Sequence, residues 1–61
     1  MENKDSIQMW IMTSNNICKT MNLAMEKNDT DVIIELLNQF KEATHQLETL
    51  LIIEKEDRFT A

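Results

Sequence analysis

The sequence contains no glycine, no proline and no tyrosine, and it has one cysteine among its 61 residues. Sheet proteins need tight turns, which usually depend on glycine, proline, or an Asn-Gly or Asp-Gly pair, and none of these is present. The single Cys18 cannot form a disulfide within the chain, which fits a reducing compartment. These absences exclude sheet folds and disulfide-stabilised scaffolds and favour an all-α protein.

Long apolar runs are missing as well. No run exceeds four residues, as in 50–53, whereas a membrane span needs about 18 to 20. The first residues lack the basic and apolar regions of a secretory signal. We therefore expect a cytoplasmic protein with no membrane contact.

The small size of the chain creates a problem of stability. Residues 1–61 make one domain, and domains below about 70 to 80 residues rarely gain more than ~3–5 kcal/mol from a single core. The sequence offers neither a disulfide nor a cluster of metal ligands to add to this. A second copy of the chain, or another protein, is the expected source of additional stability.

Apolar side chains follow a helical spacing through the first half of the chain. This stripe consists of Ile7, Trp10, Ile11, Ser14, Ile17, Cys18, Met21, Ala24 and Met25. Its steps of three and four residues predict a helix over about 6–27, in which Met21 and Met25 belong to the core. Asp5 is the expected N-cap, with Gln8 completing a capping box. Ser14 interrupts the stripe, and its hydroxyl either bonds back to a helix carbonyl or allows close helix approach near a dimer axis.

The pattern breaks at 27–30 and then resumes. Asn28 is expected in a left-handed conformation, and Asp29 or Thr30 is expected to cap a second helix. The second stripe consists of Ile33, Leu36, Leu37, Phe40, Ala43, Leu47, Leu50 and Leu51. It predicts a helix over about 30–57, and the short joint at 28–29 forces the two helices into an antiparallel hairpin.

Several apolar residues fall outside what the two stripes can bury. The first helix is expected to cover the second only to about Leu51. Exposed apolar surface on a small protein usually marks an interface, so we predict a hairpin that dimerises into a four-helix bundle. The predicted contacts with the second copy or with a target are Met9, Met12, Leu23, Ile52, Ile53 and Phe59.

One pair of residues suggests chemistry. Glu42 and His45 have the Glu-x-x-His spacing that supplies ligands in di-iron helix bundles. With Phe40 at the centre of the stripe, however, both are expected on the outer face, where they read as solvated side chains. Cys18 lies on the apolar stripe and reads as a packing residue. The sequence therefore predicts no enzyme, cofactor or metal site, and a metal-dependent bundle enzyme using Glu42 and His45 is the least favoured alternative.

The charge is negative and unevenly distributed. Eleven acids and six bases give a net charge of −5, all of which arises from residues 29–61. This negative charge opposes contact with phosphates, so direct nucleic-acid binding is not the favoured function. The charge instead suits a partner protein with a basic surface. We predict a small acidic protein–protein interaction module: a dimeric regulator, inhibitor or adaptor. Its size and composition are compatible with a phage or mobile-element origin and a host target.

Residues 22–37, NLAMEKNDTDVIIELL, resemble the first hairpin of flagellar export chaperones. The likeness covers a helix end, the turn Glu26-Lys27-Asn28-Asp29 and the start of a helix containing Leu36 and Leu37. It implies the alternative function of a secretion or flagellar chaperone-like subunit that covers a helix of its client. No functional residue is carried over from that family, because the expected C-terminal helix is not seen in this sequence.

Overall fold

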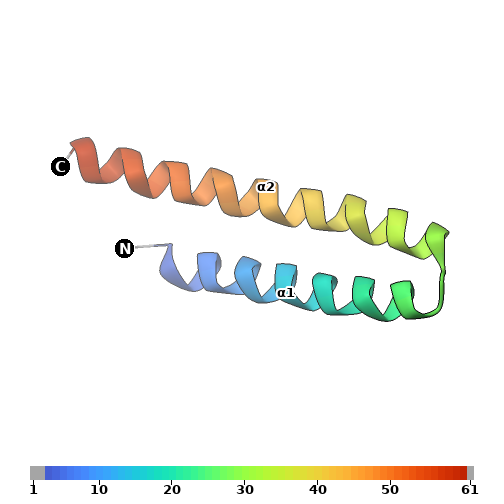
Figure 1. The fold of residues 1–61 in the computed structure, drawn as a ribbon. Helices are drawn as coiled ribbons and strands as arrows, with labels where there is room; N and C mark the ends of the chain where they lie inside the picture. The colour runs from blue at the N-terminus through green and yellow to red at the C-terminus, as the bar shows by residue number, and fades with distance from the viewer. Residues whose placement is uncertain (1–2, 61) are drawn as a thin grey trace.

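The computed structural model describes the backbone of residues 3–60 and the side chains of residues 3–56. It consists of two helices, α1 (Lys4–Glu26) and α2 (Thr30–Thr60), which run antiparallel as a hairpin (Figure 1). No strand occurs in this part of the chain. The predicted all-α helical hairpin is therefore confirmed. Neither helix carries an apolar stretch long enough to cross a membrane within the described residues.

The turn has the geometry that its residues predict. Asn28 adopts a left-handed conformation with φ of 56°, which asparagine tolerates better than most residues that carry a Cβ. The Asn28 N–H donates to the carbonyl of Met25, and the Asp29 N–H donates to that of Ala24. These two bonds are those of a Schellman motif, which satisfies carbonyls at the end of α1. The Asp29 carboxylate then caps α2 by accepting the Val32 N–H at 3.4 Å.

The start of α1 differs from the prediction. The helix begins at Lys4, its N-cap is Asn3, and Asp5 lies inside the first turn. The predicted cap at Asp5 is therefore wrong. The Asn3 side chain makes no capping bond either, but the Asn3 backbone N–H donates to the Glu54 carboxylate of α2 at 2.8 Å. Because α2 supplies this acceptor, α1 starts two residues early and reaches Glu54 rather than Leu51.

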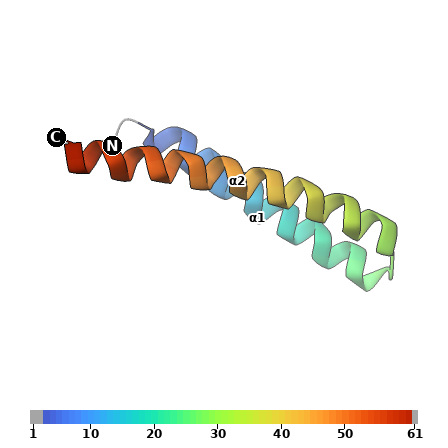
Figure 2. The same ribbon diagram turned by 90° about the horizontal axis from the view of Figure 1, so that it is seen from above.

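The contact between the helices is a thin seam. The buried residues are Ile7, Ser14 and Ala24 of α1 with Ala43 and Glu54 of α2. Half-buried side chains that complete it are Trp10, Ile17, Met21, Ile33, Leu36, Phe40, Leu47 and Leu50. Among the described side chains, no large one is fully buried. The hairpin measures 50 × 15 × 10 Å, and its helices cross at a shallow angle (Figure 2).

The turn and the Asn3–Glu54 bond set the register of the seam. Asn3 lies as many positions before Asn28 as Glu54 lies after Asp29, and the two residues are hydrogen-bonded. Residues that are equally far from the turn therefore lie level, that is, opposite each other across the seam. By the same rule, Ser14 lies 14 positions before Asn28, and Ala43 lies 14 positions after Asp29. The middle of the seam is therefore made by two small buried residues, Ser14 and Ala43.

Candidate interaction surface

One side of the hairpin is apolar between its two ends, where the same rows of residues carry Lys4 and Thr30. Residues at a spacing of seven form a row on each helix, because seven residues make almost two turns. The rows flank the seam, and the antiparallel pairing places both on the same side. We call this side the apolar face. It consists of Ile11, Cys18 and Met25 of α1 with Leu37, Thr44 and Leu51 of α2.

The large side chains of the apolar face are open to solvent. Ile11, Leu37 and Leu51 are each more than 40% exposed, and Met25 is 61% exposed. Cys18 is half-buried and carries a free thiol. Thr44 donates its hydroxyl to the carbonyls of Phe40 at 2.9 Å and Lys41 at 3.0 Å, so its polar group is already satisfied within α2. The hydrogen-bonding groups of the face are therefore few, namely the Cys18 thiol and the acceptor sites of the Thr44 hydroxyl.

The opposite side of the seam is mostly polar. Its residues are Ser6, Thr13, Thr20 and Lys27 of α1 with Val32, Gln39, Gln46 and Ile53 of α2. Apolar residues occur here only at the two ends, in Val32 and Ile53. A helix pair needs two apolar positions per heptad to form its seam, whereas helices in larger bundles carry a third on one flank. Both helices have this third position, and both present it on the same side.

Ser14 lies under the middle of the apolar face. It is 9% exposed, and its neighbours one turn away on α1 are Ile11 and Cys18. Its Oγ is buried and has no hydrogen-bond partner. Of the two roles that the sequence left open, bonding back to a helix carbonyl is therefore not realised. An unpaired buried hydroxyl costs about 1–3 kcal/mol, so this position is unfavourable in the isolated hairpin.

Other helical hydroxyls of the chain do bond back. Four of them donate to the backbone oxygen four residues earlier at 2.9–3.0 Å: Thr13, Thr20, Thr44 and Thr49. Ser14 stands in the same helical environment but does not follow this pattern. Its hydroxyl is thus left without a partner in the single hairpin.

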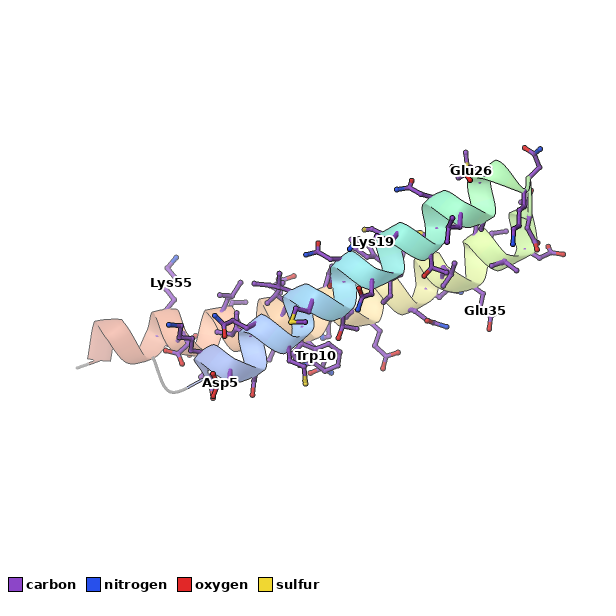
Figure 3. All side chains as sticks on the ribbon, turned by 90° about the horizontal axis from the view of Figure 1, so that it is seen from below. Asp5, Trp10, Lys19, Glu26, Glu35 and Lys55 are labelled. Carbon is purple, nitrogen blue, oxygen red and sulfur yellow. The ribbon has the colours of Figure 1, made fainter. Side chains whose placement is uncertain are left out.

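On α1, charge in the row of the apolar face is confined to Lys4 at the open end of the hairpin. Residues 6–18 of α1 contain no charged side chain, and the face is bordered on α1 by the amides Gln8, Asn15 and Asn22. The acids concentrate on α2, where Glu35 points away from α1, while Lys19 projects from the far side of α1 (Figure 3). Apolar contact on this face would therefore bury few charges.

The residues considered for metal chemistry lie on the outer surface of the hairpin. Glu42 and His45 are both exposed on α2, on the outer side that the position of Phe40 predicts. The described residues contain no group of three or more histidine, cysteine or acidic side chains placed to hold a metal ion.

The predicted contact residues are exposed but scattered. Met9 and Met12 line one shallow groove on α1, whereas Leu23 lines another beside the turn, with Val32. Ile52 and Ile53 are exposed near the other end of the hairpin, on α2. The side chain of Phe59 lies outside the described residues. The structure therefore brings Met9 and Met12 together and keeps the other contact residues apart.

The apolar face contains residues of the two predicted stripes. Met25 was expected in the core, and this is wrong because the side chain is 61% exposed. A seam between two helices covers only two positions per heptad, so the third position of each stripe stays open. The signal was present in the sequence as the spacing of seven among Ile11, Cys18 and Met25, repeated by Leu37 and Leu51.

Comparison with known proteins adds no further constraint. No family model matches the chain, and neither the curated proteins nor the solved structures contain a match.

Proposed function

We propose that this chain is a small acidic protein–protein interaction module that works as a homodimer. The apolar faces of two hairpins pack against each other and form a four-helix bundle. The observation that carries the proposal is the one-sided distribution of apolar side chains, which run along most of one side of the seam and are largely absent from the other.

The solvent-exposed area of the single hairpin is larger than expected, by about the area that one partner buries in an interface. The hairpin exposes 5010 Å², whereas a compact monomer of 7.2 kDa is expected to expose about 4,100 Å². The difference is close to the ~800 Å² that each partner buries in an interface of standard size. A second copy offers the same apolar face with the same uncharged border on α1, so the two surfaces are complementary without a further partner.

The outer faces of the dimer would then serve a target. Acids of α2 such as Glu35 and Glu42 stay exposed in this arrangement, and they favour the approach of a basic protein surface. Apolar anchors on these outer faces are Met9, Met12, Leu23 and Ile52. The module acts as a regulator, inhibitor or adaptor by presenting them on a rigid bundle. A reducing cytoplasm suits a chain whose single thiol lies in the dimer contact.

Two neighbouring residues of α2 provide a matched test of the dimer. Leu51 is 44% exposed on the apolar face, and Ile52 is 47% exposed on the outer face. We expect the wild-type chain and Ile52→Glu to sediment as dimers at micromolar concentration. Leu51→Glu should sediment as a monomer, because a carboxylate on the apolar face would have to be buried without a partner.

Two results would contradict the proposal. One is a wild-type chain that remains a folded monomer throughout the concentration range. The other is a dimer that Ile52→Glu disrupts and Leu51→Glu does not, since this would place the contact on the outer face. A chain that gains helical structure only in the presence of an amphipathic client helix would support the chaperone-like alternative instead.

A further inference from the structure

We infer that Ser14 lies at the two-fold axis of the homodimer, where its hydroxyl hydrogen-bonds to Ser14 of the second copy. This inference rests on the proposed dimer and specifies where its axis passes. It assigns Ser14 the role of setting the register in which the two hairpins meet.

The first argument is the location of the residue. The axis of a symmetric dimer passes through the centre of the shared surface, where a residue meets its own copy. On α1 the centre of the apolar face lies between Ile11 and Met25, beside Cys18 and Ser14. On α2 the corresponding level is that of Ala43 and Thr44. These small side chains allow two hairpins to approach closely at this level, whereas the ends of the face carry larger ones.

The second argument is the unsatisfied hydroxyl. Ser14 is nine-tenths buried, and its Oγ has no partner within the hairpin. The threonines of the same helices satisfy their hydroxyls locally, so the helical backbone does not prevent such bonds. The Oγ is closed to solvent in the single hairpin, so a second copy on the apolar face would supply the missing partner only once the Ser14 side chain turns toward it.

The third argument concerns the chemistry of pairing with an identical group. A hydroxyl carries one donor and two acceptor sites, so two serines related by a two-fold axis can bond to each other. Two carboxylates or two ammonium groups would repel at such a point. On this face the Thr44 hydroxyl already donates its proton to its own helix, and residues 6–18 carry no charge, so neither donates to Ser14.

The pairing would select one arrangement of the dimer. If the hairpins slid past each other along the apolar face, both hydroxyls would be buried against apolar side chains without a partner. A single polar group in an otherwise apolar contact is known to set register and oligomeric state in this way, at some cost in stability. Ser14 would thus favour one alignment of the two hairpins over the other alignments that an apolar surface permits.

Mixed dimers test the pairing directly. The wild-type chain and Ser14→Ala are combined in equal amounts, equilibrated, and examined by native mass spectrometry, which separates the three dimers by their difference of one oxygen atom. In the mixed dimer the serine has lost its partner, whereas in the Ser14→Ala dimer no hydroxyl is left unpaired. We expect the proportion of the mixed dimer to be at least about threefold below the statistical value. A statistical proportion overturns the inference.

The control is Thr13→Ala, mixed with the wild type in the same way. Thr13 lies on the polar side, and its hydroxyl is bonded to Met9 within α1, so its mixed dimer should form in statistical proportion. A wild-type chain without any dimer contradicts the proposed function itself, which separates that failure from a failure of the Ser14 pairing.

A second measurement is independent of the energetics of pairing. In a Cys18→Ala background, Ser14→Cys should form a disulfide between copies under mild oxidation, because paired serines place their Cα atoms within the reach of a disulfide. Thr13→Cys in the same background should stay reduced. An absence of the Ser14→Cys cross-link in a sample that is dimeric overturns the inference.

Discussion

The backbone N–H of Asn3 donates to the Glu54 carboxylate at 2.8 Å, which joins the start of α1 to the last third of α2 across 51 positions of the chain. Glu54 is only 7% exposed. The first N–H groups of a helix lack partners within it, and they are usually satisfied by a nearby side chain of the same segment. Here the opposite helix supplies the acceptor, so the same bond caps α1 and closes the open end of the hairpin.

Replacement of Glu54 should therefore reduce stability. We expect Glu54→Ala to lower the free energy of unfolding by about 1–2 kcal/mol, since it leaves the Asn3 N–H without an acceptor and opens the end of the seam. Glu54→Gln keeps an acceptor oxygen and should lose less. Urea unfolding followed by circular dichroism measures both. Equal losses for the two variants would show that the hydrogen bond does not matter.

The left-handed Asn28 gives a second prediction. Alanine at a φ of 56° carries a steric penalty that glycine avoids, so Asn28→Ala should destabilise the hairpin by about 1 kcal/mol. Asn28→Gly should be at least as stable as the wild type. Thermal unfolding of the two variants checks this. An alanine variant as stable as the glycine variant would argue against the Schellman turn.

The small size of Ala43 is expected to be essential in the middle of the seam. Ala43 is 2% exposed and lies level with Ser14, so Ala43→Leu would overfill the contact and cost about 1–3 kcal/mol. The neighbouring Glu42 is exposed, and Glu42→Leu should change the unfolding free energy by less than about 0.5 kcal/mol. Urea unfolding at one fixed protein concentration compares the variants. A tolerated Ala43→Leu would mean that the register inferred for the seam is wrong.

Cys18 reports on the dimer through its chemistry. Its free thiol is half-buried in the hairpin and belongs to the apolar face, so dimer formation should cover it. We expect the rate of its reaction with a thiol reagent to fall as the protein concentration rises from the monomeric to the dimeric range. Leu51→Glu should remove this dependence on concentration, because the variant stays monomeric and its Cys18 thiol stays uncovered. A rate independent of concentration in the wild type would contradict the proposed contact.

The predictable parts of the fold depend on neighbours in the chain. The helical spacing of Ile7, Trp10 and Ser14 predicts α1, and the chain without glycine leaves Asn28 as the residue best suited to the left-handed turn. The N-cap was predicted wrongly at Asp5, because capping rules consider only residues close in sequence, whereas the acceptor here comes from Glu54 on the other helix. Met25 was wrongly assigned to the core for a related reason, since one stripe can be wider than the seam it forms.

Only part of the proposed dimer contact could be predicted from the sequence. Exposed apolar residues off the stripes, such as Met12 and Ile52, attract attention in the sequence, but they lie on separate outer faces. The apolar face is made from stripe residues instead, and it exists as a surface only when α1 and α2 are antiparallel and in register. Whether these residues contact a second copy is the prediction that Leu51→Glu and Ile52→Glu test.

The amino-acid sequence by itself determined two helices, a short turn and an acidic second half, because these follow from periodicity, chain punctuation and composition over a few neighbouring residues. The tertiary structure decided which third of each stripe stays open, where α1 begins, and that the hydroxyl of Ser14 is left without a partner. These features arise from how two helices meet at a seam that is only two side chains wide in each heptad. No local pattern specifies which groups will be level across such a seam.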